Sequence, residues 1–393
     1  MTAGPMLALF SVHQRDAPID ARERFVRTLP PVAGSDVLAL TTCHRVEIAV
    51  ALTPTVDIRG AIADLLRIEL PFEGTIRTGR DAVLHLLRVA CGLDSVVRGE
   101  GQILGQLRRA FDAGRTNGGL DPSLALVARR AIELARELRR TTALGTVHRS
   151  LGSLAVDTAL DGVSDPARAA VLVIGAGEVG KLAMRALASR VATIVIANRD
   201  PARAAELASV HGAAAVSLEL LDDALVSVAS VIAAADTRGM LLTADRLRAR
   251  LARGPLAIVD LAVPRSVAPD ARDLEGLRYV DVDGLSDAAG AQLEPAAVAE
   301  IEARCAAAAG AVMRELDVRR VAPTIRALHE RADAIRRKQL ERALSRLAHL
   351  GSRDRQVVES LSEGLAHALL HEPTIRLRDA PERERAARDL FAL

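Results

Sequence analysis

The chain has 393 residues, of which 50% are hydrophobic, and its 52 basic and 50 acidic residues give a net charge of +2. This length can bury two or three cores, and no run of about twenty uncharged apolar residues crosses the sequence, so we expect a multidomain protein outside the membrane. The start of the chain lacks the pattern of a secretory signal, which favours a cytoplasmic location.

The composition also restricts the kinds of site. Aromatic residues make up 2% of the chain, which argues against broad base-stacking platforms for nucleic acid, although local arginine clusters can contact phosphates. Cys43, Cys91 and Cys305 are an odd number of cysteines without zinc spacing. They argue against a disulfide framework and against a cysteine-built metal site, and we predict no metal.

The first part of the chain mixes strand and helix patterns. Residues 1 to about 70 contain the strand-like runs LALFSV, DVLALTT and VEIAVAL and the helical pattern RGAIADLLRIEL. From residue 81 to about residue 161 the apolar spacing is helical. We therefore predict an α+β domain that ends in helices, over residues 1–150.

The rest of the chain changes pattern twice. Residues 165–290 contain the short apolar runs VLVIG, IVIAN, SVIAAA, LAIVDLA and RYVDVD, most of them separated by helical segments, as in a parallel sheet. From Glu294 onward the pattern is helical, with predicted interruptions at Pro323 and Pro373 and a turn at Gly351. The predicted fold class is multidomain α/β, with a central Rossmann-type domain over residues 151–291 and an all-helical domain over residues 292–393 that packs on its own chain or pairs with a second copy.

The run VLVIGAGEVGKLAMRALA predicts a dinucleotide site. Gly175, Gly177 and Gly180 follow a strand and open a helix, whose N-terminus attracts a pyrophosphate. After the next strand, where NAD binders usually carry an acid, the chain has Asn198 and Arg199, and an arginine suits the 2′-phosphate of NADPH. The alternatives are a plain glycine turn and a solvated arginine. The predicted cofactor-binding residues are Gly175, Ala176, Gly177, Glu178, Val179, Gly180, Asn198 and Arg199.

The run TTCHRVEI places Cys43 among polar neighbours. A lone cysteine after a strand is most often a buried packing residue, as we expect for Cys91 and Cys305. Polar and charged neighbours are costly to bury beside an inert thiol. A thiolate needs nearby positive charge, which Arg45 or His44 supplies, and on an extended strand Cys43 and Arg45 would face the same way.

A nucleophilic cysteine together with NADPH restricts the chemistry. A free carboxylate resists hydride addition, so the substrate is either an aldehyde that becomes a thioester or an activated acyl group that becomes an aldehyde. Because the nucleotide domain follows the cysteine domain, the two sites have to meet across an interdomain cleft, and domain movement would gate hydride transfer.

Several motifs together resemble one family. The stretches TTCHRVEI, HLLRVACGLDSVVRGEGQILGQLRRAF, ELRRTTALG, GAGEVG, DLAVPRSVAPD, VDVDGL and LLHEPTIRLR follow the order and approximate spacing of glutamyl-tRNA reductases. The resemblance covers essentially the whole chain. It implies NADPH-dependent conversion of glutamyl-tRNA to glutamate-1-semialdehyde, the first step of tetrapyrrole synthesis from glutamate, without ATP or a metal in the chemistry.

The resemblance also implies roles for single residues. Cys43 would attack the aminoacyl ester and hold a glutamyl thioester, Arg45 would pair with a substrate carboxylate, and Glu100 would hold the substrate ammonium. His85 aligns with a histidine important for activity, a possible acid or base, although a histidine in this helical pattern more often has a local partner. The implied substrate-binding residues are Thr42, His44, Arg45, Ser95, Glu100, Gly101, Gln102 and Gln106.

The chain departs from the family pattern at several positions, namely His44 in place of asparagine, Gln14 and Arg15 before the AP pair, Arg98, and Gly101. Each change is tolerable singly, but together they leave open a divergent paralogue. The rival interpretations are another NADP-dependent dehydrogenase with a structural Cys43 and a catalytically silent dimeric regulator.

The resemblance further implies partners. The family forms V-shaped homodimers through C-terminal helices, and the apolar spacing over residues 324–370 fits such an interface. Glutamate-1-semialdehyde aminomutase is a possible recipient of the product. Arg129, Arg136 and Arg140 share one helix face that either contacts tRNA phosphates or is simply solvated.

Overall fold

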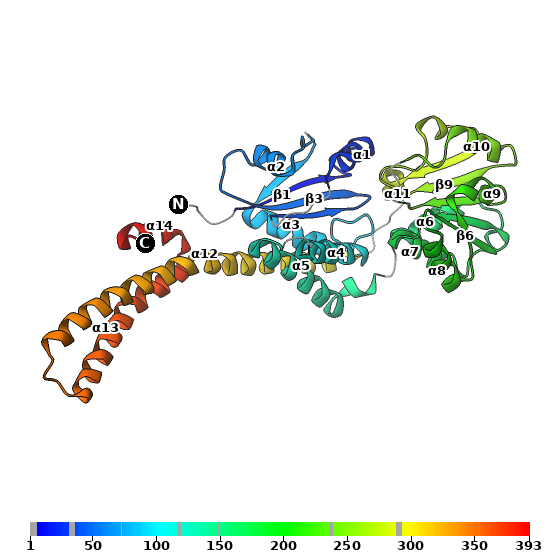
Figure 1. Ribbon diagram of the computed structural model, residues 1–393. Helices are drawn as coiled ribbons and strands as arrows, with labels where there is room; N and C mark the ends of the chain where they lie inside the picture. Colours follow the sequence, from blue (N-terminus) through cyan, green and yellow to red (C-terminus); the bar gives the residue numbers. More distant parts are fainter. Residues whose placement is uncertain are drawn as a thin grey trace. The chain divides into compact units, whose positions relative to one another are not determined.

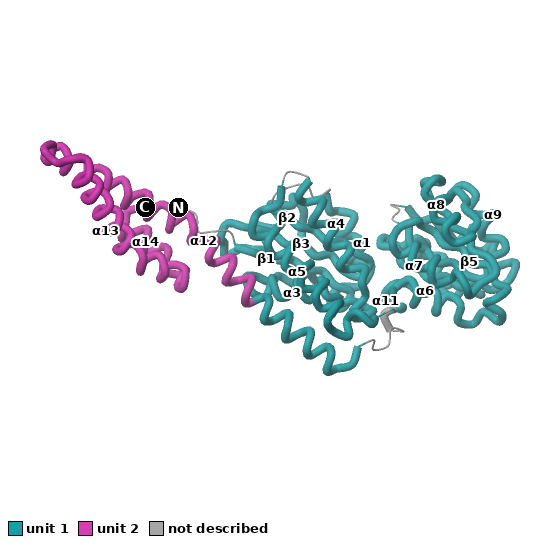
Figure 2. Tube along the Cα trace, turned by 90° about the horizontal axis from the view of Figure 1, so that it is seen from below, with its two compact units in different colours: residues 1–309 teal, residues 310–393 magenta. Residues whose placement is uncertain are grey.

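The computed structural model describes residues 6–30, 36–71, 73–116, 119–147, 150–235, 239–287 and 293–393. The chain divides into two compact units, Met1–Ala309 and Gly310–Leu393 (Figure 2). The first unit contains two separate β-sheets, and the second is helical. Within the described ranges, no helix has the length and apolar character needed to cross a membrane.

The N-terminal region, residues 6–147, is built on an antiparallel four-stranded sheet of order β2-β3-β1-β4. Helices α1 and α2 cover one face of this sheet, and α3, α4 and α5 lie on the other (Figure 1). Both faces of the central strands are therefore buried, which explains their continuous apolar runs. The elements are β1 (Met6–His13), α1 (Ile19–Thr28), β2 (Val37–Thr41), β3 (Arg45–Leu52), α2 (Ile58–Leu66), β4 (Thr75–Thr78), α3 (Gly79–Cys91), α4 (Gln102–Thr116), α5 (Pro122–Thr141) and the 3₁₀ turn η1 (Ala143–Thr146).

The central region, residues 150–287, is built on a parallel six-stranded sheet of order β10-β9-β8-β5-β6-β7. The order reverses between β5 and β8, as in doubly wound dinucleotide-binding folds. Side chains of β5 alternate between two cores, with Val171 and Val173 packed in one and Leu172 and Ile174 in the other.

Helices α6, α7 and α8 pack in the first of these cores, and α9 and α10 pack in the second (Figure 1). The elements are α6 (Leu151–Leu160), η2 (Pro166–Arg168), β5 (Ala170–Ile174), α7 (Glu178–Leu187), β6 (Thr193–Asn198), α8 (Pro201–His211), β7 (Ala214–Ser217), η3 (Leu218–Leu220), α9 (Leu221–Leu225), β8 (Ser230–Ala233), α10 (Ala244–Leu251), β9 (Leu256–Asp260), η4 (Pro269–Ala271), β10 (Leu277–Asp281) and α11 (Val282–Asp287).

The C-terminal part is formed by the helices α12 (Pro295–Arg346), α13 (Ser352–Asp379) and α14 (Glu384–Phe391), with the 3₁₀ turn η5 (Pro381–Arg383). The predicted interruptions at Pro323 and Pro373 are wrong, because α12 and α13 continue through them. Proline removes one backbone donor, but the remaining hydrogen bonds of a long helix hold the chain on both sides of the ring. The turn at Gly351 is confirmed, since this residue caps α13.

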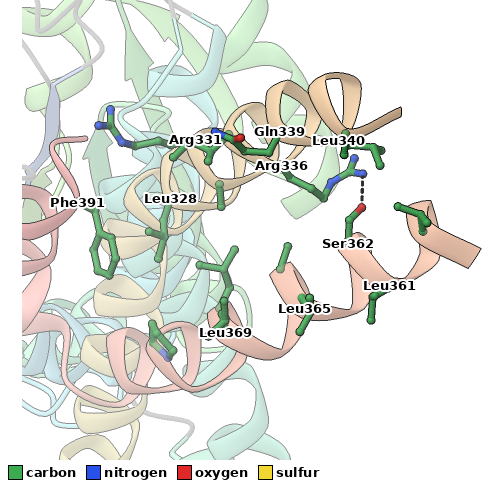
Figure 3. A pocket seen from close by; sticks show the side chains of 17 residues that line it. Leu328, Arg331, Arg336, Gln339, Leu340, Leu361, Ser362, Leu365, Leu369 and Phe391 are labelled. Carbon is green, nitrogen blue, oxygen red and sulfur yellow. Dashed lines mark hydrogen bonds between the residues drawn. The ribbon is translucent and has the colours of Figure 1, made fainter. Parts of the chain in front are cut away.

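An apolar groove of about 730 Å³ runs between α12 and α13 in the second unit (Figure 3). Its side chains are largely exposed, at 55% for Ile335, 60% for Leu361, 56% for Leu365 and 74% for Leu369. Exposed apolar contact area of this kind marks an interaction surface.

The three-part fold class is confirmed, with an α+β region, a Rossmann-type parallel sheet and a helical C-terminal part. Ser150, at the predicted boundary between residues 150 and 151, is the N-cap of α6, and the boundary itself stays a prediction. The predicted boundary between residues 291 and 292 lies outside the described residues.

Candidate active site

Cys43 lies at the tip of a tight hairpin turn between β2 and β3. The backbone N–H of Thr42 donates to the carbonyl of Arg45 at 2.9 Å, and the Thr42 hydroxyl accepts from the Arg45 N–H at 3.2 Å. The expectation of an extended strand through Cys43 is therefore wrong, because the chain reverses direction at Cys43 and His44. The turn still places Cys43 and Arg45 in one pocket.

This pocket gathers most of the predicted substrate residues. Leu151 of α6 and Val179 of α7 lie in its wall, so the central region contributes to it directly. Gly101 is exposed and does not line it. The predicted residues that do line it are Thr42, Cys43, His44, Arg45, Ser95, Glu100, Gln102 and Gln106.

The thiol of Cys43 is protonated in this arrangement. Burial raises its pKa to about 12, and the nearby Glu100 carboxyl adds to the rise, while Arg22 and Arg45 lower it by less. The expectation that Arg45 or His44 would make a thiolate is therefore not met while the pocket is closed. The sulfur lies 3.1 Å from Nδ1 of His44, whose own pKa burial holds well below its ordinary value, so the imidazole is neutral and only a weak base while the pocket is closed.

Four buried polar atoms of the pocket lining have no hydrogen-bond partner among the described residues: Nε2 of His44, Nη1 of Arg45, Oε2 of Glu100 and Nε2 of Gln102. Nη1 of Arg45 is 3.6 Å from a carboxylate oxygen of Glu47, beyond hydrogen-bond length. Buried polar atoms are normally paired, so unpaired ones point to a missing ligand. Unpaired donors and an unpaired carboxyl oxygen in one pocket suit a substrate that carries both a carboxylate and an ammonium group.

Helix α5 fixes the loop that carries Glu100 through hydrogen bonds from Arg139. Arg139 donates to the carbonyls of Gly99 at 2.9 Å and of Glu100 at 2.5 Å. Gly99 has a φ of +85°, which favours glycine, and its N–H donates to the carbonyl of Gly92 at 2.9 Å. Burial raises the pKa of Glu100 to about 7, so this carboxyl is partly protonated near neutral pH.

His85 lies outside the Cys43 pocket. It hydrogen-bonds with Glu47 at 3.0 Å and lines a second, polar cavity of about 440 Å³ together with His13, Arg88 and Asp94. Its catalytic role stays a prediction. Glu47 connects His85 to the pocket, because it contacts both His85 and Arg45.

The glycine loop has the shape that a dinucleotide needs. Gly175 has a φ of +109°, and a Cβ there would lie 2.6 Å from the carbonyl oxygen of Ala234. A side chain on Gly180 would collide with the carbonyl of Gly175, whereas a Cβ on Gly177 would meet open space. The first and third glycines therefore permit close packing, and the second leaves room for a pyrophosphate at the N-terminus of α7.

The end of β6 carries the residues that are expected to set the preference between NADPH and NADH. The side-chain oxygen of Asn198 accepts from the N–H of Ala176 at 3.3 Å, so Asn198 fixes the glycine loop. Arg199 is exposed beside it. Of the glycine-loop residues, Val179 reaches the Cys43 pocket, so the thiol and the dinucleotide loop adjoin each other.

Three family models match consecutive parts of the chain. "Glutamyl-tRNAGlu reductase, N-terminal domain" covers residues 10–142, "Shikimate / quinate 5-dehydrogenase" covers residues 157–288, and "Glutamyl-tRNAGlu reductase, dimerisation domain" covers residues 300–393. A curated glutamyl-tRNA reductase of Myxococcus xanthus is 34% identical over 98% of this chain and 94% of its own length. The chain belongs to the glutamyl-tRNA reductase family.

Other members support the same assignment. The glutamyl-tRNA reductase of Halobacterium salinarum is 36% identical over 95% of this chain and 86% of its own length. The solved structure of glutamyl-tRNA reductase from Methanopyrus kandleri is 27% identical, covers 100% of both chains and superposes with a TM-score of 0.51. Membership of this family makes the protein an oxidoreductase that uses a nicotinamide dinucleotide.

The sequence interpretation missed the buried charges behind Arg45. The guanidinium of Arg45 donates to the backbone carbonyl of Asp94 and lies 3.2 Å from Nε2 of His13. Arg88 in turn pairs with the Asp94 carboxylate at 3.2 Å, and its charge holds the pKa of that carboxyl well below its usual range against the opposing effect of burial. One of these groups, His13, could have been noticed in the sequence, because it stands one place before the position of the family's usual histidine.

Proposed function

We propose that the protein reduces the glutamyl group of glutamyl-tRNA to glutamate-1-semialdehyde with NADPH, through a thioester on Cys43. The observation that carries this proposal is the Cys43 pocket, in which unpaired polar atoms surround a thiol that adjoins the dinucleotide loop. Family membership over almost the whole chain supports the same reaction.

In the first step, the sulfur of Cys43 attacks the ester carbonyl, a C–S bond forms, the ester C–O bond breaks, and tRNA leaves with a free hydroxyl. The thiol proton passes to a base and from there to the leaving oxygen. Nδ1 of His44, at 3.1 Å from the sulfur, is the nearest such base. Arg45 holds the substrate carboxylate and Glu100 its ammonium group, which would keep Glu100 ionised.

In the second step the thioester carbonyl is reduced and the thiol is regenerated. NADPH supplies the hydride when it is bound. The N-terminus of α7 at Gly177 would hold the pyrophosphate, and Arg199 would hold the 2′-phosphate, which favours NADPH over NADH. Leu151 and Val179 place apolar side chains in the wall of the pocket, which would limit the access of water to a thioester.

The tRNA would be held through its phosphates by α4 and α5. Their exposed surfaces are rich in arginine and almost free of aromatic side chains, which fits recognition of a backbone rather than of stacked bases. The exposed arginines are Arg108, Arg109, Arg115, Arg129, Arg130, Arg136 and Arg140.

A second copy of the chain would cover the groove between α12 and α13. The family model for the dimerisation domain spans this groove, and its exposed leucines need an apolar partner. Because the aldehyde product is reactive, we also propose that an aminomutase for glutamate-1-semialdehyde takes it up in the cytoplasm.

The decisive experiment uses tRNA charged with labelled glutamate and no cofactor. We expect one label per Cys43, stable to denaturation and removed by hydroxylamine, as a thioester requires. Addition of NADPH should convert the label to semialdehyde. Cys43→Ser should abolish the labile label, whereas Cys305→Ala, which changes a fully buried packing thiol, should keep it.

The rival functions give other results. A dehydrogenase with a structural Cys43 would take no label and would retain its own activity in Cys43→Ser. A silent regulator would show neither label nor turnover with correctly charged tRNA. Either result would contradict the proposed function.

A further inference from the structure

Two adjacent charged residues of α1 connect the Cys43 turn with the central region. Nη1 of Arg22 donates to the backbone carbonyl of Cys43 at 2.5 Å, and Nη2 pairs with the carboxylate of Asp283 in α11. The next residue, Glu23, accepts from the backbone N–H of Arg265 at 2.6 Å and from its Nε at 2.9 Å. Asp283 and Arg265 belong to VDVDGL and DLAVPRSVAPD, motifs that the chemistry above leaves without a role.

Three of the four side chains in these pairs are largely buried, and Asp283 is partly exposed. The side chains of Arg22, Arg265 and Glu23 are 2%, 7% and 11% exposed, and that of Asp283 is 36% exposed. The loop that carries Arg265 is fixed by Asp260, whose carboxylate accepts from the N–H groups of Ser266 at 2.8 Å and Val267 at 3.0 Å. Breaking such a pair leaves a buried charge unpaired, so the pairs favour the arrangement in which the two regions touch.

That arrangement closes the Cys43 pocket. The accessible space among its walls is about 10 Å³, which is roughly enough for one water molecule and too little for a glutamyl group. A glutamyl group therefore enters only after Leu151 of α6 and Val179 of α7 move away from the thiol. Because α6, α7, α11 and the Arg265 loop share the central sheet region, such a movement also separates the pairs on α1.

We propose that Arg22 and Glu23 form a latch with Asp283 and Arg265, and that Arg22 is a positioning residue that joins closure of the central region to the conformation of the Cys43 turn. Opening of the latch admits the charged tRNA end, and closing of the latch brings the dinucleotide loop onto the thioester. The latch rests on the proposed function, since it separates acyl transfer from hydride transfer.

The test measures the two steps separately. Acyl transfer is the rate at which Cys43 takes label from charged tRNA without cofactor, and hydride transfer is the rate at which preformed thioester yields semialdehyde after NADPH is added. Asp283→Asn weakens the closed arrangement without touching the Cys43 turn. We expect acyl transfer at or above the wild-type rate and hydride transfer slower by about tenfold, less than for a fully buried ion pair because the Asp283 side chain is 36% exposed.

Matched variants show whether Asp283 acts through Arg22. Asp223→Asn changes an exposed acid of the same region and should alter neither rate. Arg22→Met should slow both steps, because it also removes the contact with the Cys43 carbonyl. In that background Asp283→Asn should have no further effect, since its partner is already gone.

The outcomes distinguish the two proposals. If wild type takes no label, the proposed function fails and the latch fails with it. If wild type is labelled but Asp283→Asn slows both steps equally, or slows neither, the latch alone is wrong. Should circular dichroism show that Asp283→Asn is unfolded, Arg265→Lys tests the same split from the second pair. Lysine cannot reproduce the two side-chain contacts that Nε and Nη2 of Arg265 make with the Glu23 carboxylate.

Discussion

Replacement of Glu100 by glutamine should make the folded protein more stable, and increasingly so as the pH rises. Glu100 is 8% exposed, its Oε2 has no partner, and burial raises the pKa of its carboxyl from 4.5 to about 7. Glutamine has nearly the same shape and keeps an acceptor oxygen, but it has no charge to bury.

The sign follows from proton linkage. Because the folded-state pKa is the higher one, the favourable contribution of this carboxyl is fully present below pH 4.5 and is lost as the pH rises towards about 7. The full loss is about 3 kcal/mol, at 1.36 kcal/mol for each unit of pKa difference. Glutamine does not titrate, so the free energy of unfolding of Glu100→Gln should exceed that of wild type by a margin that grows with pH.

Urea unfolding followed by circular dichroism measures this margin. Between about pH 5 and pH 8.5 it should widen by about 2.5 kcal/mol. Glu206→Gln, at an exposed position of α8, should show a constant margin over the same range. If the margin of Glu100→Gln is equally constant, the carboxyl ionises in the folded protein as it does in water, and the description of this pocket as enclosed and water-poor is refuted.

Three further substitutions test the other parts of the proposal. Arg45→Lys should lower kcat/KM for charged tRNA by about 100-fold in steady-state assays, because lysine lacks the planar fork that binds a carboxylate, and an unchanged value would remove Arg45 from substrate binding. Arg199→Ala should reduce the preference for NADPH over NADH by about tenfold, measured from kcat/KM with each cofactor, and an unaltered ratio would place the 2′-phosphate elsewhere. Leu369→Asp should dissociate the homodimer in sedimentation experiments, because it places a charge in the apolar groove. The control Val210→Asp, at a 73% exposed position, should leave the homodimer intact. A dimer that survives Leu369→Asp does not use the groove.

Much of the central region was predictable because its strands are dense in branched apolar residues. VLVI and IVIAN each fill a buried strand, and the glycines follow where a parallel sheet meets a helix. Strands β7 (AAVS) and β4 (TIRT) gave no usable signal in the sequence. Runs this short and weakly apolar become strands because a neighbouring strand of the folded sheet pairs with them. The predicted helix interruptions at proline were wrong, because the many hydrogen bonds of the surrounding helix outweigh the one that proline removes.

The site was predictable where its residues are close in sequence. Thr42 to Arg45 lie in one turn, and the motif that contains Glu100 supplied further residues that line the pocket. Arg22 and Glu23 gave no comparable signal, because charges on an amphipathic helix usually face solvent. Their partners lie 261 and 242 residues away, so only the fold brings them together.

The ionisation of Cys43 links these observations. Burial is the first cause of its raised pKa, and it comes from the same closure that Leu151 and Val179 provide. When the central region moves away, water reaches the sulfur and this cause weakens, while Arg22 and Arg45 still favour the thiolate. Attack on the ester therefore belongs to the open arrangement, where the thiol gives up its proton more readily and the substrate has room. Reduction belongs to the closed arrangement, where the sulfur is acylated and has no charge to bury, and where exclusion of water preserves the thioester until hydride is transferred.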